Sequence, residues 1–317
     1  MTLNIVSCRP DLDASWDAFC ARSLNATFLH SRRFLGYHGE RFEDASVLLF
    51  DGDKLVGVMP AARAANDSAT VVSHPGVTYG GIVHQGGLVG NRMIDALGDL
   101  RRHYVSLGYT KLLYKAVPFI YGRAAAQDDL YALFRHDATR SRCDLSCAID
   151  LWQPLPSSER RRRALKKAMR VVTLSHERDD LGALWTVLDD NLRRKHGTQP
   201  VHTLDEIELL IQRFPDNIAI RCAKVNGKVE AGVVLFNSCR VWHAQYIASS
   251  EIGYEASALD AVFDAVIREA TNAGNRYFDF GTSNEQGGAV LNDGLYRFKQ
   301  EFGGSGVAHE FYELTLP

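Results

Sequence analysis

Two stretches of the chain place a tight polar turn between two apolar runs. In residues 47–58 the turn is Asp51-Gly52-Asp53, and in residues 218–236 it is Asn226-Gly227. Asp-Gly and Asn-Gly pairs between apolar runs favour a hairpin, because these residues adopt positive φ angles at little cost. In both stretches a lysine follows the turn and a second glycine stands at the same offset. The pattern predicts two β-hairpins in equivalent surroundings.

Each hairpin is followed by a segment with helical spacing and then by a strand. Apolar residues recur at helical intervals in 93–104 and 259–270, a glycine follows each, and strand-like runs come next at 111–115 and 277–280. Apolar positions at i, i+3 and i+4 before a glycine are typical of an amphipathic helix and its C-terminal cap. The repeated order predicts an α/β (α+β) fold of two tandem domains, each a mixed, mainly antiparallel sheet flanked by helices. The alternative is a chance similarity of two mixed segments.

The predicted domains are residues 1–150 and 151–317. Pro154 and Pro156 indicate a linker, and a strongly basic helix at 159–170 follows it. The cations of this helix would suit a phosphate-bearing acceptor, a tRNA or an anionic membrane surface. The alternative is a solvated linker helix, which is what most charge runs are. Two further helices are expected at 181–194 and 203–214.

The composition favours some classes of protein and argues against others. The chain has 317 residues, of which 46% are hydrophobic and 23% charged, with a formal net charge of −2. These values are typical of a globular protein and argue against a dedicated nucleic-acid-binding protein, although a local basic patch is compatible with them. The six cysteines lack zinc-ligand spacing, so no metal is expected. With no signal-peptide pattern and no membrane-spanning apolar run, we expect a cytoplasmic protein.

A strand at 240–247 leads through small residues into the helix that begins near Ala258. Strand alternation predicts His243, Gln245 and Ile247 on one face and Trp242, Ala244 and Tyr246 on the other. A strand that enters a helix through small residues presents free backbone N–H groups to an anion. An ordinary connection is the alternative, since two carboxylates lie in the loop. The donor-binding candidates are His243, Gln245, Tyr246, Ser250, Gly253 and Ser257.

The C-terminal region carries the catalytic candidates. A buried-type strand ends in Asp279, a polar loop holds Glu285, and Lys299 stands between two phenylalanines. Acyl transfer to an amine needs a base and a group that stabilises the oxyanion. Asp279 or Glu285 would be the base, and Lys299 would face the negative charge. The alternatives are a turn cap for Asp279, a solvated loop residue for Glu285 and a lysine snorkelling from an apolar surface.

Acceptor-binding candidates lie in the first domain and on the basic helix. Glycines beside an aromatic residue allow a ligand to approach the backbone closely, and Tyr79-Gly80-Gly81 has this pattern. Tyr121 follows the strand at 111–115. The alternative is a tight bend with core aromatic residues. The acceptor candidates are Tyr79, Gly80, Gly81, Tyr121, Arg163 and Lys167.

The closing motif resembles that of the FemAB-like branch of the GNAT acyltransferases. Its residues are Phe278-Asp279-Phe280-Gly281 and, after Leu291-Asn292-Asp293-Gly294-Leu295, Phe298-Lys299 and Phe302-Gly303-Gly304. The resemblance spans most of the chain. It implies two tandem GNAT domains, with Lys299 at the transfer site, the donor bound by the second domain and the acceptor partly by the first.

The family transfers amino acids from aminoacyl-tRNA to peptidoglycan precursors, or acylates sugar amines and other small amines, in part from acyl-CoA. This chain lacks the long helical hairpin of some tRNA-dependent members. Its loop at 250–256 also lacks the full Q/R-x-x-G-x-G/A pattern that holds coenzyme A.

The resulting hypothesis is an N-acyltransferase that acts on an amine of a cell-envelope or surface-polysaccharide precursor by direct transfer. The cosubstrate would be an acyl-CoA or an aminoacyl-tRNA, and the acceptor a small-molecule, lipid-linked or nucleotide-linked amino sugar. A peripheral membrane contact is compatible with this hypothesis, whereas DNA is not an expected partner. The alternative is a catalytically inactive GNAT-like module that binds RNA or an anionic partner through the basic helix.

Overall fold

The computed structural model describes residues 2–316, with all side chains except those of residues 195 and 196. The chain divides into two compact units. Unit 1 takes residues up to 145 together with 284–290 and the residues from 308 onward, and unit 2 takes 146–283 and 291–307. The division at 150/151 into two domains stays a prediction. The fold class is confirmed, because helices flank mixed, mostly antiparallel sheets.

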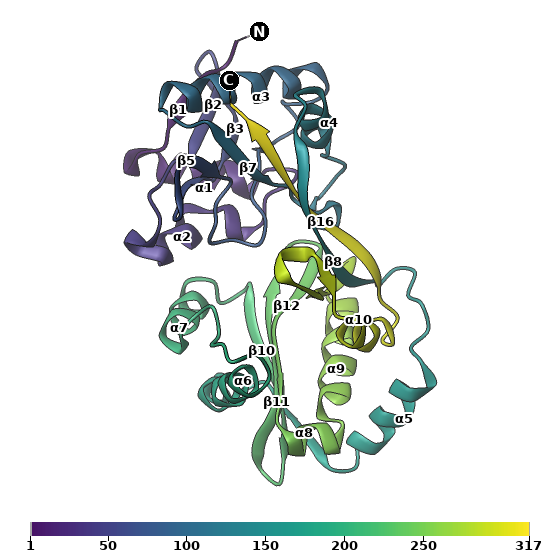
Figure 1. Cartoon of the computed structure of the whole chain (residues 1–317). Coiled ribbons are helices and arrows are strands. Elements are labelled where there is room, and N and C mark those ends of the chain that lie inside the picture. The colour runs from purple at the N-terminus through teal and green to yellow at the C-terminus, as the bar shows by residue number, and fades with distance from the viewer. Residues whose placement is uncertain (1, 317) are drawn as a thin grey trace. The chain divides into compact units, whose positions relative to one another are not determined.

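Unit 1 contains two groups of strands (Figure 1). The first is an antiparallel sheet in the order β1-β2-β3-β6, and the second has the order β4-β5-β7-β16, with β5 and β7 parallel. The strands are β1 (Asn4–Ser7), β2 (Val47–Asp51), β3 (Lys54–Met59), β4 (Ala62–Ala64), β5 (Asp67–Val72), β6 (Val83–His84), β7 (Lys111–Lys115) and β16 (Ser305–Thr315). The helices are α1 (Asp13–Ala21), α2 (Arg32–Leu35), α3 (Asn91–Ser106) and α4 (Asp128–Arg135).

Unit 2 is built on strands in the order β8-β13-β12-β11-β10-β9, in which β12 and β13 are parallel. The strands β8 and β16 each have residues in both units. The strands are β8 (Thr139–Asp150), β9 (Val172–Ser175), β10 (Ile218–Val225), β11 (Lys228–Asn237), β12 (Val241–Ser249) and β13 (Tyr277–Thr282). The short strands β14 (Asn284–Glu285) and β15 (Val290–Leu291) pair with each other, and all their residues except Leu291 belong to unit 1. The helices are α5 (Glu159–Ala168), α6 (Leu181–His196), α7 (Leu204–Arg213), α8 (Glu251–Ala256), α9 (Ala258–Asn272) and α10 (Asp293–Gln300).

Both predicted hairpins are confirmed. β2 and β3 pair from Asp51 and Lys54 outward, and β10 and β11 from Val225 and Lys228. In the second turn Asn226 and Gly227 both have positive φ, 52° and 80°, as a two-residue hairpin turn requires. The helix α7 starts at a capping box, because Thr203 Oγ1 accepts from the Glu206 N–H and the Glu206 carboxylate accepts from the Thr203 N–H.

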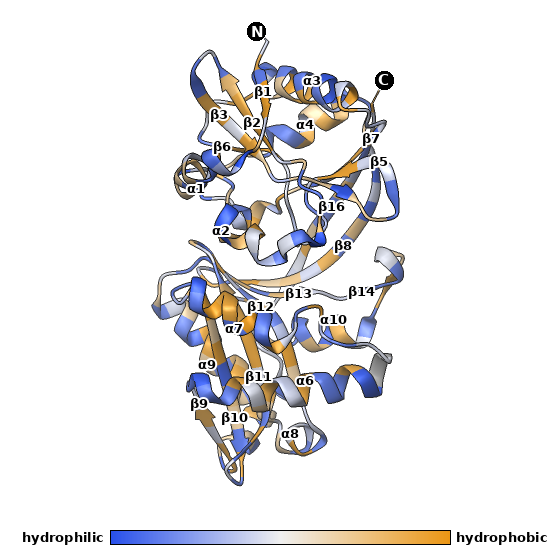
Figure 2. Cartoon of the chain, turned by 90° about the vertical axis from the view of Figure 1, so that its left-hand side faces the viewer, coloured by the Kyte–Doolittle hydropathy of each residue, from blue (hydrophilic) through white to orange (hydrophobic). Residues whose placement is uncertain are grey.

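The core of unit 2 lies between the sheet and α9. Figure 1 shows α9 along one face of the strands and α6 and α7 along the other. The apolar stripe of α9 packs on alternate residues of β13, and Phe263 meets Phe278 and Phe280 at ring-centroid distances of 6.1 and 4.9 Å. Figure 2 shows the apolar character of β10 and β11, as expected for strands covered by helices. Among the described residues, no helix is both long and apolar enough to span a bilayer.

The predicted alternation along β12 is wrong beyond Ala244. The partner strand pairs Leu235 with Ala244 but Val234 with Tyr246, so Gln245 forms a β-bulge. A bulge adds one residue and moves each later side chain to the opposite face. Ile247 therefore packs against the α9 core together with Trp242 and Ala244, rather than sharing a face with His243.

Candidate functional site

The strands β12 and β13 pair over only three residue pairs, of which His243–Asp279 is the last. Beyond this pair β12 remains hydrogen-bonded to β11 as far as Ser249. Its other edge therefore carries backbone groups that β13 does not satisfy.

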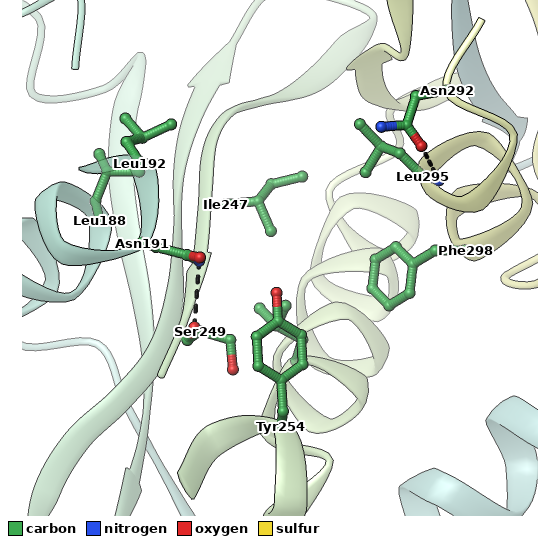
Figure 3. A pocket seen from close by; sticks show the side chains of 10 residues that line it. Leu188, Asn191, Leu192, Ile247, Ser249, Tyr254, Asn292, Leu295 and Phe298 are labelled. Carbon is green, nitrogen blue, oxygen red and sulfur yellow. Dashed lines mark hydrogen bonds between the residues drawn. The ribbon is translucent and has the colours of Figure 1, made fainter. Parts of the chain in front are cut away.

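A pocket of about 450 Å³ borders this part of β12 (Figure 3). Residues of α6, β12, α8, α9 and α10 line it, and most of them are apolar. They are Leu188, Asn191, Leu192, Ile247, Ser249, Tyr254, Leu259, Asn292, Leu295 and Phe298.

Among the described residues that line the pocket, Asn191 has a buried polar atom without a hydrogen-bond partner. Asn191 Nδ2 donates to the Ser249 carbonyl oxygen at 3.2 Å, which fixes the orientation of the amide (Figure 3). Asn191 Oδ1 is buried and accepts no hydrogen bond from the described residues. A buried acceptor without a donor costs about 1–3 kcal/mol. A ligand N–H group in the pocket would remove this cost.

Where the sequence predicted free backbone N–H groups for an anion, protein side chains take part of that place. Ser250 Oγ accepts from the Gly253 N–H at 3.0 Å and donates to the Glu230 carboxylate. A Cβ atom at Gly253 would lie 2.4 Å from the Glu230 carbonyl oxygen, so only glycine fits there. Ser257, with φ of 57°, joins α8 to α9. The first turn of α8 is therefore capped by a side chain and adjoins a carboxylate, which is a poor setting for a phosphate.

Lys299 is buried at the end of β13. Its Nζ donates to the carbonyl oxygens of Gly281 at 2.9 Å and Thr282 at 2.7 Å. Burial lowers its pKa to about 8, and the nearby Asp279 carboxylate opposes this shift. Next to these carbonyl groups, Ser283 Oγ is buried and has no hydrogen-bond partner among the described residues.

Asp279 is completely buried, and three donors surround its carboxylate. His243 Nδ1 lies 2.8 Å from Oδ2, while Ser146 Oγ and the Gly281 N–H, the latter at 3.0 Å, donate to Oδ1. The structure therefore brings together His243 and Asp279, which the sequence assigned to different roles. It adds Ser146, which lies 133 positions from Asp279 and carries no motif.

The remaining candidates of the second domain lie elsewhere. Tyr246 Oη bonds with His202 Nδ1 at 2.5 Å and its ring packs edge-on against Trp185, so it faces α6 and the segment just before α7. Gln245 occupies the bulge. Glu285 is exposed on β14, in the segment that belongs to unit 1.

The acceptor candidates of unit 1 are core residues. The rings of Tyr79 and Tyr121 are 4.6 Å apart, and Tyr79 Oη donates to Thr27 Oγ1 at 3.2 Å. Both tyrosines are almost fully buried. A Cβ atom at Gly80 would lie 2.0 Å from the Ser73 carbonyl oxygen, and Gly81 has φ of +78°.

The basic helix α5 has one inward and several outward cations. Arg161 is buried, and its guanidinium donates to Asp260 at 3.0 Å and to Glu301 at 3.0 Å. This pairing joins α5 to the first turn of α9 and to the end of α10. Arg163 and Lys167 are exposed on the same helix.

Comparisons with known proteins define the class. The family model described as an acetyltransferase (GNAT) domain matches residues 157–300. A search of curated proteins found no match. Residues 157–300 form a GNAT acetyltransferase domain, and the chain is an acyltransferase.

Solved structures show the fold of the whole chain. FemX has a TM-score of 0.68 at 10% identity, covering 99% of this chain and 97% of that one. L-PGS from Bacillus licheniformis has a TM-score of 0.59 at 13% identity, covering 88% and 85%. A tandem GNAT protein from the clavulanic acid biosynthesis pathway has a TM-score of 0.56 at 11% identity, covering 99% of each chain. The chain has a FemAB-like tandem GNAT fold.

Proposed function

We propose that this protein transfers an acyl group from a thioester donor, bound in the pocket of unit 2, to an amine acceptor. The acyl carbon would pass directly to the amine nitrogen without a covalent intermediate on the enzyme. The acceptor would be an amino group of a cell-envelope precursor, as the FemAB-like resemblance implies. A cytoplasmic location stays a prediction.

The observation that carries this proposal is the chemistry of the pocket. Its walls are mostly apolar, one side is the edge of β12 beyond its pairing with β13, and Asn191 Oδ1 accepts no hydrogen bond from any described residue. An extended chain with amide groups fits such a site, because its N–H and C=O groups pair with a strand edge and its methylene groups contact the walls. The pantetheine arm of an acyl thioester is such a chain.

Lys299 supplies the charge that the reaction needs. An ammonium group has three protons, and Lys299 Nζ uses two of them on the carbonyl oxygens of Gly281 and Thr282. The third proton would be donated to the oxygen that becomes negative when the amine attacks the acyl carbon. A donor fixed in this way before the reaction stabilises the transition state without reorganisation.

A second candidate donor is an aminoacyl-tRNA. It is favoured by the exposed cations of α5, among them Arg163 and Lys167, and by the self-capped first turn of α8. Phosphate contacts of this kind make binding steeply dependent on salt. An inactive RNA-binding module would show the same dependence without any transfer.

The two donors are separated by supplying each with a sugar amine. We expect acetyl-CoA or octanoyl-CoA with D-glucosamine to release free thiol at a rate that depends on the protein, and lysyl-tRNA under the same conditions to give no lysyl-glucosamine. The Asn191→Leu variant should raise the KM for the thioester about fivefold to tenfold, because one hydrogen bond is lost. Transfer from lysyl-tRNA alone would replace the thioester proposal, and RNA binding without transfer from any donor would refute both donors.

A further inference from the structure

The cluster around Asp279 has the connections of a general base and its positioning group. His243 lies on β12 and Asp279 on β13, at the last residue pair before the strands separate. The imidazole is 13% exposed, whereas the carboxylate is completely inaccessible. A proton acceptor must reach the substrate, so the partly accessible imidazole is the better candidate of the two.

The hydrogen bonds determine which ring nitrogen of His243 holds the proton. An ionised carboxylate only accepts hydrogen bonds, and Asp279 takes them from Ser146 Oγ, the Gly281 N–H and His243 Nδ1. The proton therefore sits on Nδ1, and in the neutral ring the lone pair sits on Nε2. This is the tautomer that a base needs when it acts through Nε2.

Gly281 connects this base to Lys299. Its carbonyl oxygen accepts from Lys299 Nζ at 2.9 Å, while a Cβ atom on it would lie 3.2 Å from His243 Cε1. The cation and the imidazole thus both adjoin the same glycine, which has φ of +77°. An oxyanion donor and a base must surround the same reacting carbon, and this arrangement brings them together.

We propose that His243 is the general base of the acyl transfer and that Asp279, supported by Ser146, is a positioning residue that holds its tautomer. This assignment rests on the proposed function. The amine nitrogen forms the new C–N bond and gives its proton to His243 Nε2. The electron pair of the breaking bond to the acyl carbon leaves with the thiolate, which takes the proton back from the imidazolium.

The isosteric Asp279→Asn variant tests the tautomer directly. Two donors still point at the Oδ1 position, so the amide oxygen must stay there and the NH₂ group must take the place of Oδ2. That NH₂ group donates to His243 Nδ1 and leaves the ring proton on Nε2. The variant therefore keeps the shape of the cluster and reverses the tautomer.

The first measurement does not depend on turnover. Long-range ¹H–¹⁵N correlation spectra of the ¹⁵N-histidine-labelled protein, with His243 assigned through His243→Gln, should show Nδ1–H in the unmodified protein and Nε2–H in Asp279→Asn. The Ser146→Ala variant removes only one donor to Asp279, so His243 should keep Nδ1–H. An Nε2–H proton in the unmodified protein, or the same tautomer in Asp279→Asn, overturns the proposal.

The second measurement uses thiol release from acetyl-CoA with D-glucosamine. His243→Ala and Asp279→Asn should each lower kcat by about 10²–10³-fold, in the range expected for loss of a general base. Added imidazole should raise the kcat of His243→Ala at least tenfold and should leave the kcat of Asp279→Asn unchanged. Full activity of His243→Ala overturns the assignment of the base, and absence of rescue shows a structural role instead. If the unmodified protein shows no transfer but His243 has the expected tautomer, the proposed substrates fail and the tautomer assignment survives.

Discussion

Both units bury a lysine whose ammonium group donates to two backbone carbonyl oxygens. Lys115 at the end of β7 in unit 1 donates to Val77 and, at 3.1 Å, to His74, and Lys299 in unit 2 donates to Gly281 and Thr282. Burial lowers the pKa of Lys115 to about 7 and that of Lys299 to about 8. The same local arrangement, a buried ammonium group bonded to two backbone carbonyl oxygens, therefore occurs in both halves of the chain.

The neighbours of the two lysines differ. The charge of Arg142 acts on Lys115 and lowers the pKa of Lys115 further. In the loop that Lys115 binds, the ring of His74 stacks on that of His38 at a centroid distance of 5.1 Å. The charges that act on Lys299 include the Asp279 carboxylate, which favours the ammonium form. Lys115 therefore holds a loop beside a second cation, whereas Lys299 lies near a carboxylate that favours its charged form.

The strands near these two lysines also differ between the units. In unit 1 the third strand of the hairpin sheet, β6, has only two residues and pairs with β3, while β7 belongs to the other group of strands. In unit 2 the equivalent strands β12 and β13 stay paired at three positions and separate beyond them. Only unit 2 therefore holds two ionisable side chains across a strand pair next to an unpaired strand edge, within the described residues.

The largest expected difference between the units concerns catalysis. Lys299→Met should lower kcat for thiol release by about 10²–10³-fold, because one donor to the oxyanion is lost, with donor affinity retained. Lys115→Met should leave kcat per folded molecule unchanged. Steady-state kinetics with acetyl-CoA and circular dichroism on both variants make this comparison, and equal losses of kcat would remove the distinction.

A smaller effect is expected from a methyl group beside His243. Gly281 and Gly108 both have positive φ, 77° and 88°, but a Cβ atom meets the His243 ring only at Gly281 and nothing within 4 Å at Gly108. Alanine at either position should lower the free energy of unfolding by about 1–2 kcal/mol. Only Gly281→Ala should also lower kcat, by about tenfold, because displacing a catalytic group slows the reaction.

Urea unfolding and turnover measured on both glycine variants make this comparison. An equal effect of the two substitutions on turnover would show that the His243 ring is not part of the reaction.

The smallest effect concerns stability against pH. A lysine with a lowered pKa binds fewer protons in the folded than in the unfolded protein, so its contribution to stability rises with pH. The rise should extend from about pH 7 to 10.5 for Lys115 and from about pH 8 to 10.5 for Lys299. The measurement is the difference in thermal midpoint between the unmodified protein and each variant. This difference should increase over a wider pH range for Lys115→Met than for Lys299→Met. A difference that falls with rising pH would contradict the burial of these ammonium groups.

The local patterns of the sequence predicted much of the fold. The hairpin turns, the helix α9 with its closing Gly274 and the capping box of α7 depend on residues close together in the chain. The bulge at Gln245 was not predictable, since it arises from the register against β11. It changed the predicted neighbours of His243 and the position of Ile247.

The site was predicted less well than the fold. Lys299 and Asp279 follow from a local motif. Ser146 and Asn191 have no signal of their own, because their importance comes from strands and helices far away in sequence. The basic run indicated a binding helix, yet Arg161 within it is a buried ion-pair partner of Asp260 and Glu301, which only the packing of α5 on α9 reveals.

The central claim, that the pocket of unit 2 binds the acyl donor, is tested most directly by calorimetric titration with octanoyl-CoA. Leu295 lines the pocket, and Leu107 is an exposed leucine of unit 1. We predict that the unmodified protein and Leu107→Trp bind the thioester alike, and that Leu295→Trp, whose indole fills the pocket, does not bind it. Equal binding by all three proteins, or no binding by the unmodified protein, would contradict the claim.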